Sequence, residues 1–262
     1  MKPDIKRFFE KKKRIPIWSI LIWIIIWQLL AMYLNSDILL SSPLQAAVCL
    51  FSMMKTQSYW SAVFFSFFRI MSGFVLAVTV GILFCVLSYI SSVLRDFISF
   101  PISVVKSTPV ASFIILVLIW IPSKNISVFI SFLMAFPIIY TNLLQGLYQM
   151  DEKMLELSKI FRLSFIKQVR YIYIPHVLPF FKAACMTSLG LCVKSGVAAE
   201  IIGLPKGSIG ENLYEAKIYL STPEMFAWTV TIIVLGIIME KIVMMLINKI
   251  VMKLEGMNYG EK

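Results

Sequence analysis

Long apolar runs occupy most of this chain and are separated by short polar stretches. Six of them are candidates for membrane crossing: residues 15–34, 71–90, 97–121, 126–150, 183–202 and 225–247. A helix needs about 20 apolar residues to cross the hydrocarbon core of a bilayer. None of the runs alternates apolar and polar positions, which is the pattern of a membrane β-barrel strand. The pattern therefore predicts an all-α integral membrane protein with six transmembrane helices.

Basic residues are concentrated in particular loops, and this sets the predicted topology. Lys and Arg are frequent in residues 1–14 and in the loop at 151–182, whereas segments 35–60 and 203–223 hold only a few lysines. Lys and Arg beside membrane spans favour the cytoplasmic side. We therefore predict a basic cytoplasmic tail at 1–14, one transmembrane domain over 15–255, and both termini in the cytoplasm.

The first apolar run looks at first like the core of a signal peptide, because basic residues precede it. It is about 20 residues long, which is enough to span a membrane. No small-residue cleavage site of the A-x-A kind follows it. We expect it to be retained as a membrane anchor.

Composition supports the membrane class. Of the 262 residues, 59% are hydrophobic and 15% are charged, with a net charge of +11. The basic residues flank the apolar runs and share no face with interleaved aromatic residues, so we expect contact with the lipid bilayer and no nucleic acid. The four cysteines have no CxxC spacing and there is a single histidine. We therefore expect buried, inert thiols and no metal site.

The loop at 151–182 has helical patterning that a simple connector does not need. Met154, Leu157 and Phe161 fall at i, i+3 and i+7, which places them on one face of a helix. Ser164 is suited to cap a second helix, and prolines interrupt the pattern after it. The loop is predicted to form two short amphipathic helices at the cytoplasmic surface.

Within this loop, spacing matches a known motif. Glu156, Leu157 and Ser158 are followed by Arg162 and then by the segment 172–175, which begins with Ile and ends with Pro. This resembles the EAA motif of ABC importer permeases, which reads E-A-A, three residues, G, nine residues, then I-x-L-P. Leu157 and Ser158 replace the two alanines, and Arg162 replaces the glycine. A non-Gly residue in a left-handed turn costs about 1 kcal/mol, so the turn is either strained or made differently.

The resemblance extends from about residue 58 to 250. Its other landmarks resemble the nitrate, sulfonate, taurine and bicarbonate branch of these permeases: residues 69–74 (RIMSGF), 106–109 (KSTP), 135–137 (AFP), 199–203 (AEIIG) and 222–228 (TPEMFAW). The resemblance implies a multi-pass subunit of a bacterial inner membrane, with a cytoplasmic coupling loop between the fourth and fifth spans. It also implies a homodimer, two cytoplasmic ATPase subunits and an extracytoplasmic solute-binding protein.

The resemblance assigns roles to the loop residues. In this family the loop inserts into a cleft on the ATPase. The positions that match the motif are Glu156, Leu157, Ser158, Arg162, Ile172 and Pro175. Glu156 would be the polar anchor, and Met154, Leu157 and Phe161 would supply buried area. The chain has no GxxxxGK[ST] phosphate loop, so ATP and Mg²⁺ are expected on the partner, and no catalytic residue or cofactor is expected here.

Two charged residues lie within the fifth apolar run. Lys194 and Glu200 are six residues apart, which places them on different faces of a helix. Ionised groups at membrane depth cost about 2.5–3.5 kcal/mol and often mark a solute pathway. Both are therefore candidates for the translocation path, with Lys194 attracting an anion. The alternatives are an interfacial Glu200 and a Lys194 that snorkels to the membrane surface or pairs with a neighbouring helix.

The predicted function is transport of a small solute, with ATP hydrolysis on a separate subunit. A sulfonate-, nitrate- or taurine-like anion is the expected cargo, and a thiamine pyrimidine precursor is the alternative for the same importer type. An ion-coupled secondary transporter is a different-class alternative, for which repeated halves with broken helices would be expected. An intramembrane enzyme would need a catalytic constellation, and one histidine with scattered carboxylates does not provide it.

Overall fold

The computed structural model describes residues 17–34 and 39–259, so the predicted tail at 1–14 lies outside the described residues. Every regular element in the described ranges is helical. The α-helices are α2 (Ile17–Leu34), α3 (Pro43–Met53), α4 (Gln57–Ile90), α5 (Ser92–Ser107), α6 (Val110–Val117), α7 (Ile126–Tyr148), α8 (Glu152–Ile160), α9 (Phe165–Gln168), α10 (Ile174–Gly203), α11 (Ile209–Ile218) and α12 (Thr222–Tyr259). A 3₁₀ turn at Ser123–Asn125 precedes α7, and a π-helix at Val169–Tyr173 joins α9 to α10.

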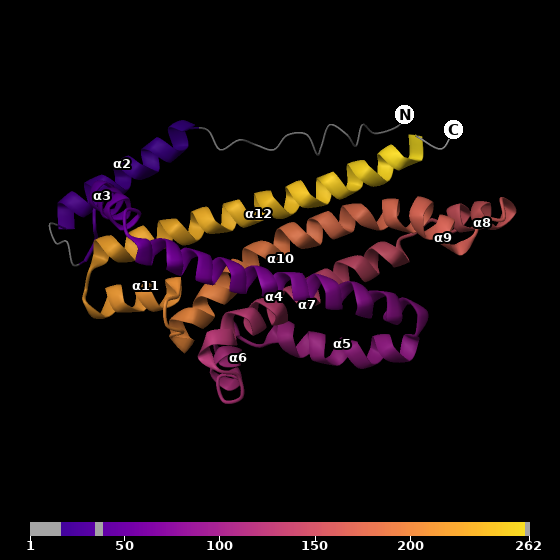
Figure 1. Cartoon of the computed structure of the whole chain (residues 1–262), viewed down its shortest axis with the longest axis horizontal. Coiled ribbons are helices and arrows are strands. Elements are labelled where there is room, and N and C mark those ends of the chain that lie inside the picture. Colours follow the sequence, from indigo (N-terminus) through magenta and orange to yellow (C-terminus); the bar gives the residue numbers. More distant parts are fainter. Residues whose placement is uncertain (1–16, 35–38, 260–262) are drawn as a thin grey trace.

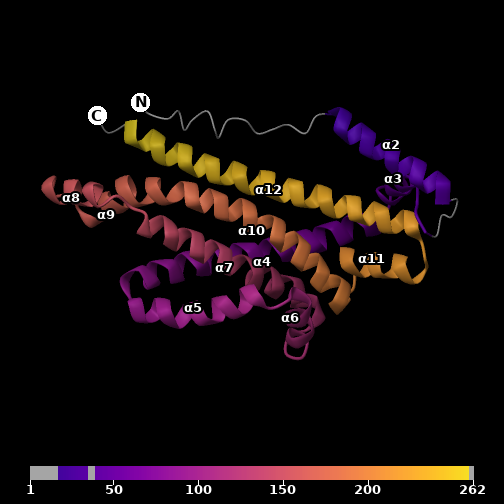
Figure 2. The same cartoon turned by 180° about the vertical axis from the view of Figure 1, so that it is seen from behind.

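Four helices are long and apolar enough to cross a membrane. They are Gln57–Ile90, Ser123–Tyr148, Phe165–Gly203 and Thr222–Lys249, and each covers all or nearly all of one of the six predicted runs. They run roughly parallel, with α2, α3 and α11 gathered at one end and α8 and α9 at the other (Figures 1 and 2). The first predicted run, 15–34, corresponds to α2, whose described part is apolar but shorter than a full span, and its first two residues lie outside the described residues.

The third predicted run, 97–121, is not one continuous helix. It is divided between α5 and α6, and the axes of these two helices meet at 107°. Thr108, between them, is extended, with φ −91° and ψ 135°. Pro109 follows it, and a proline restricts the preceding residue to the extended region. The pair α5–α6 is therefore a broken span or a re-entrant segment, and the structure holds up to five spans in its described part.

The helices also extend beyond the predicted apolar runs. The second run begins at 71 but α4 begins at Gln57, and the last run ends at 247 but α12 continues to Tyr259. The added part of α4 is itself rich in apolar residues, and Arg69 separates it from the predicted run. These two helices are longer than the predicted spans.

The core is a three-helix contact among α4, α7 and α10, in which small residues allow close approach. A side chain added at Gly73 of α4 would lie 2.8 Å from Ser131 Cβ of α7. One added at Gly196 of α10 would lie 2.7 Å both from Ile70 of α4 and from Ser131 Oγ. Because lipid offers no hydrophobic drive between helices, membrane interfaces use such small residues for van der Waals contact.

Helix α12 packs along this core by one narrow stripe. Most of its buried residues recur every fourth position: Ala227, Thr231, Leu235, Met239, Val243, Ile247 and Val251; Thr222 and Trp228 are also buried. Its opposite face exposes large apolar side chains such as Ile233, Ile237 and Leu246. In a soluble protein such a face would be unfavourable, whereas in a membrane it is suited to lipid or to another subunit.

Candidate functional site

The predicted coupling loop forms the tip of the molecule at one end of the long helices (Figures 1 and 2). Its first helix, α8, carries Met154 and Leu157 of the predicted apolar face, and Phe161 follows directly after the helix ends. Met154 is 53% exposed and Phe161 is 72% exposed, and Leu157 and Glu156 are also exposed. Ser158 is buried and its hydroxyl donates to the Leu155 carbonyl at 2.7 Å. The apolar side chains of α8 are therefore available to a partner.

The turn after α8 has the conformation that favours glycine. Arg162 has φ +47°, in the left-handed region. The Leu163 N–H donates to the Ser158 carbonyl at 3.0 Å, and the Phe161 N–H donates to the Leu157 carbonyl at 3.0 Å. In a Schellman motif at a helix end, the N–H of the residue after the left-handed one donates a hydrogen bond to a carbonyl five residues earlier. The bond from Leu163 to Ser158 has this pattern. Of the two alternatives for this turn, the strained one is found, because Arg162 occupies the left-handed position.

The second half of the loop is arranged differently from the prediction. Ser164 does stand at the start of α9, but its side chain makes no capping hydrogen bond. Helix α9 does not end as a separate short helix, since it continues through the π-helix at Val169–Tyr173 into α10. Pro175 lies in the first turn of α10 and Pro179 lies inside the helix. A π-helical turn accommodates an irregular pattern of backbone hydrogen bonds, and both prolines follow it without ending the helix.

The two ends of the motif therefore differ in their surroundings. Glu156 and Leu157 project at the tip, whereas Ile172 is half-buried in the π-helix where the loop meets the bundle, and Pro175 is exposed at the start of α10. The motif thus extends from the outermost helix of the loop to the beginning of a transmembrane helix.

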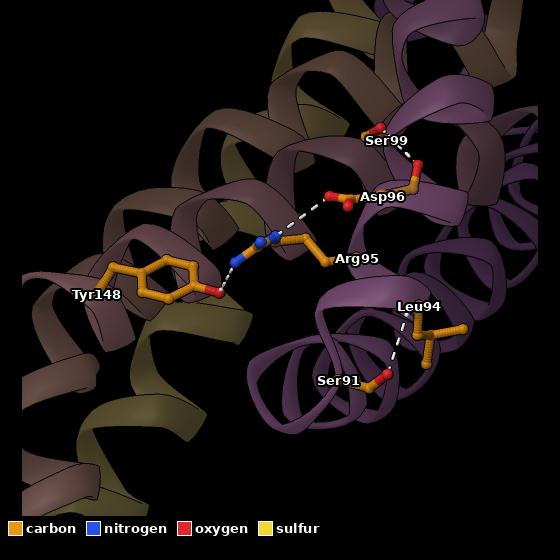
Figure 3. Close-up of polar contacts among 6 residues, drawn as sticks. All are labelled: Ser91, Leu94, Arg95, Asp96, Ser99 and Tyr148. Atoms are coloured by element: carbon orange, nitrogen blue, oxygen red, sulfur yellow. Dashed lines mark hydrogen bonds and ion pairs between the residues drawn. The ribbon is translucent and has the colours of Figure 1, made fainter.

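The loop joins the bundle at a cluster of aromatic residues and one arginine. Arg95 of α5 donates to the Tyr148 hydroxyl of α7 at 2.6 Å and lies 3.5 Å from the Asp96 carboxylate (Figure 3). The ring centroid of Tyr89, on α4, is 5.8 Å from that of Tyr148 and 6.4 Å from that of Tyr173 in the π-helix. Tyr and Arg at helix ends are typical of a membrane boundary. Sequence reasoning missed this cluster, for which the only signal was aromatic and basic residues at the ends of separate apolar runs.

An apolar pocket of about 530 Å³ lies beside this cluster. Its lining comes from α4, α7, α9, α10, α12 and the π-helix, and includes Tyr89, Leu147, Phe165, Phe181 and Val251. It offers no charged side chain, so it is not suited to hold a small anion.

The two charged residues of the fifth run lie in different surroundings. Lys194 is exposed on α10, whereas Glu200 has no exposed surface and bonds to the hydroxyls of Ser66 and Ser127. Glu200 is therefore enclosed by protein and does not reach the surface of the chain. Burial arises because α10 contacts α4, α7 and α11 around this point, and hydrogen-bond donors from those helices replace water.

Around Lys194, the exposed face of α10 carries several small and polar residues beside the apolar Met186. Ala183, Thr187 and Gly190 share this face with Lys194 at helical spacing, and all are exposed. A side chain added at Gly190 would meet nothing within 4 Å. Such a face is poorly suited to lipid, because a lysine and a threonine hydroxyl would lie in hydrocarbon.

A second lysine stands close to the break between α5 and α6. Lys106 is exposed in the last turn of α5, and its Nζ lies 3.5 Å from Thr141 Oγ1 of α7. Helix α6, which follows the break, contacts α10. Two cations thus lie on exposed parts of helices that border the same three-helix core.

The thiols and the histidine show no sign of a metal centre. The four cysteines are free, and Cys85, Cys185 and Cys192 are buried. Within the described ranges, no three His, Cys, Asp or Glu residues are close enough to hold a metal ion.

Comparison with known proteins places the chain in a family. Residues 73–253 match the family described as "Binding-protein-dependent transport system inner membrane component". A putative aliphatic sulfonates transport permease protein, SsuC of Bacillus subtilis, is 23% identical over 251 residues, covering 95% of this chain and 90% of the relative. A probable ABC transporter permease protein of Brucella melitensis is 25% identical over 181 residues, covering 69% and 73% of the two chains.

The fold is also found in a solved structure. A crystal structure described as an amino acid ABC transporter with histidines has a chain that aligns with a TM-score of 0.58 at 17% identity, covering 77% of this chain and 96% of that chain. At this identity the likeness concerns the fold alone. The family match spans more than half of the chain and confirms the resemblance noted in the sequence. The chain is therefore an ABC transporter permease and belongs to the family of binding-protein-dependent transport system inner membrane components.

Proposed function

We propose that this permease couples solute import to a separate cytoplasmic ATPase through residues 151–175. The observation that carries the proposal is the tip formed by α8, where large apolar side chains are exposed beyond the ends of the long helices. Apolar side chains that face water are unfavourably exposed and commonly mark a site of contact with another protein, whereas apolar side chains that face lipid are already in a favourable environment. The excess of Lys and Arg in this loop favours the cytoplasmic side.

The arrangement of α8 supports docking into a cleft. Met154 and Phe161 would supply the buried area, and Glu156, on another face of the same helix, would supply a polar anchor. Binding energy at interfaces is concentrated in a few such residues. Because the chain has no phosphate loop, ATP and Mg²⁺ would be held by the ATPase, of which two copies would serve a permease homodimer.

The homodimer has a physical argument of its own. The exposed face of α10 carries Lys194, Thr187 and Gly190 at membrane depth, and a single chain leaves this face open. Polar groups at that depth face protein or a water-filled cavity. A second copy of the chain would enclose this face and complete a path, with solute delivered by an extracytoplasmic binding protein.

The lysines favour an anion as the cargo. Lys106 and Lys194 would attract a sulfonate-, nitrate- or taurine-like solute, and the Bacillus subtilis relative is described as an aliphatic sulfonates permease. A neutral thiamine pyrimidine precursor would leave both charges without a role. An ion-coupled secondary transporter is disfavoured by the family, although the broken α5–α6 pair is a feature that such transporters share.

A charge reversal at the tip tests the proposal. The chain would be co-expressed with its ATPase and binding protein, followed by copurification and by uptake of ethanesulfonate, taurine and nitrate. Glu156→Lys is expected to abolish uptake and copurification of the ATPase while membrane insertion persists. Lys217→Glu, a charge reversal on the exposed face of α11 at the other end of the molecule, is the matched control. Normal uptake by Glu156→Lys would rule out the docking role.

A further inference from the structure

A carboxylate is completely enclosed at the end of α10 that lies opposite the coupling loop. Glu200 has 0% exposure, and its Oε2 accepts hydrogen bonds from Ser66 Oγ on α4 at 2.7 Å and from the Gly210 N–H on α11 at 3.3 Å. Its Oε1 accepts a hydrogen bond from Ser127 Oγ on α7 at 3.1 Å. A buried carboxylate needs donors in place of water, and here they come from three other helices. Glu200 therefore joins four helices at one point.

The start of α11 is fixed to this point in a second way. The Ile209 N–H donates to Ser66 Oγ at 3.0 Å, so Ser66 connects α11 to the carboxylate. A side chain added at Gly210 would lie 2.6 Å from the backbone carbon of Glu200 and from the backbone nitrogen of Ile201. Contacts this close are not found for real Cβ atoms, so α11 can begin here only because residue 210 is a glycine.

The other end of the same helix is the coupling loop. Phe165–Gly203 forms one helical segment of 39 residues through α9, the π-helix and α10. At a rise of 1.5 Å per residue it is about 60 Å long. Rigid elements of this kind can carry energetic coupling between distant sites, provided that both ends are firmly attached. The loop provides one attachment and Glu200 provides the other.

We infer that Glu200 fastens α10 to α4, α7 and α11, so that a movement of the coupling loop displaces these helices together at the opposite end. The inference rests on the proposed function, since it takes an ATPase to act on the loop. Glu200 is a positioning residue in this scheme and makes no contact with the solute, because its carboxylate is enclosed. Lys194 on the exposed face of the same helix keeps the solute-facing role.

The test uses the whole complex of permease, ATPase and binding protein in lipid nanodiscs. ATP hydrolysis is measured without the binding protein and then with the binding protein loaded with whichever of ethanesulfonate, taurine or nitrate the wild type imports. Glu200→Gln alters the carboxylate, and Gly210→Ala disturbs the same contact without changing Glu200. Both are expected to keep basal hydrolysis but to lose at least about fivefold in stimulation, the lower range of typical coupling between sites. Glu215→Gln, on the exposed part of α11, is the matched control and should keep wild-type stimulation.

The outcomes separate the inference from the proposed function. Wild-type complex that shows neither assembly with an ATPase nor stimulation refutes the proposed function itself. A stimulated wild type together with wild-type stimulation in Glu200→Gln and Gly210→Ala overturns the inference alone. If these two variants fail to assemble, Ser127→Ala removes one donor from the carboxylate and leaves the glycine contact intact. Loss of assembly in Ser127→Ala, or unchanged stimulation in it, would show that the contact only holds the fold, which also overturns the inference.

Discussion

Replacement of Arg162 by glycine should stabilise the turn of the coupling loop. Arg162 has φ +47°, where a side chain clashes with the backbone and the penalty is about 1–2 kcal/mol. Glycine removes that penalty but adds about 0.5–1 kcal/mol of entropy lost on ordering. Subtracting the two ranges leaves about 0–1.5 kcal/mol, with a midpoint of about 0.75 kcal/mol. At about 1.4 kcal/mol per factor of ten, the midpoint shifts the local opening equilibrium about threefold toward the closed turn.

Hydrogen exchange at a single amide reports this shift. The Leu163 N–H donates to the Ser158 carbonyl across the turn at 3.0 Å, so it exchanges only when the turn opens. In Arg162→Gly its exchange should slow about threefold, in line with that gain in free energy. Transport by the variant should be preserved or improved, because the glycine is what related permeases carry at the equivalent motif position.

A second substitution separates the backbone effect from the loss of a positive charge. Arg162→Ala removes the same charge but keeps a Cβ, so the left-handed penalty remains and the exchange rate of the Leu163 amide should stay near that of the wild type. Equal protection in the glycine and alanine variants would refute the strain argument. A severe loss of transport in Arg162→Gly would mean that the motif register from Glu156 to Pro175 is wrong.

Two further substitutions test the core and the proposed path. Gly196→Ala should lower the thermal unfolding midpoint in detergent, because the new methyl would lie 2.7 Å from Ile70 and Ser131. Overpacking of this kind costs about 1–3 kcal/mol of folding free energy. Gly190→Ala, on the same helix where an added side chain meets nothing within 4 Å, should leave the midpoint unchanged or slightly raised, and equal effects would contradict the packing argument. Lys194→Gln should reduce anion uptake by raising KM for ethanesulfonate while ATPase assembly persists. Unchanged uptake would remove Lys194 from the path.

The local features of this chain could be predicted because they depend on neighbours in sequence. The spacing from Glu156 to Arg162 predicted a turn that is either strained or made differently, and φ +47° at Arg162 identifies the strained alternative. The apolar run at 126–150 predicted α7 almost to the residue. In both cases the structure is determined by residues that are close together in the sequence.

The prolines show where such reasoning stops. Pro101 and Pro137 lie inside α5 and α7, whereas Pro109 follows the extended residue at which α5 and α6 part by 107°. All three stand within the predicted apolar runs, although Pro109 directly follows the polar residues Lys106, Ser107 and Thr108. Neighbouring helices in a membrane can satisfy the carbonyl that a proline leaves free, so the break depends on packing that hydropathy does not contain.

The burial of Glu200 could not be predicted from the sequence for the same reason. Its partners Ser66, Ser127 and Gly210 are 134, 73 and 10 positions away, and single serines in apolar runs carry no signal. A charged residue near the end of a run therefore resembled an interfacial one. Only the meeting of α4, α7, α10 and α11 distinguishes a buried carboxylate from one that reaches water.

The two connections of the coupling loop are unequal, and this bears on how it would act. Between α7 and α8 the chain leaves helical conformation at Met150 and Asp151, where the Asp151 carboxylate accepts the Lys153 N–H at 3.0 Å. Between α9 and α10 the chain stays helical throughout. A force on the tip would be absorbed by bending at the first connection, since few residues need to change φ and ψ there. At the second connection no residue leaves helical conformation, although the π-helix and Pro175 lie there, so the force would pass along the helical segment into α10. The far end of α10, at Glu200, is therefore where the proposed coupling should be tested.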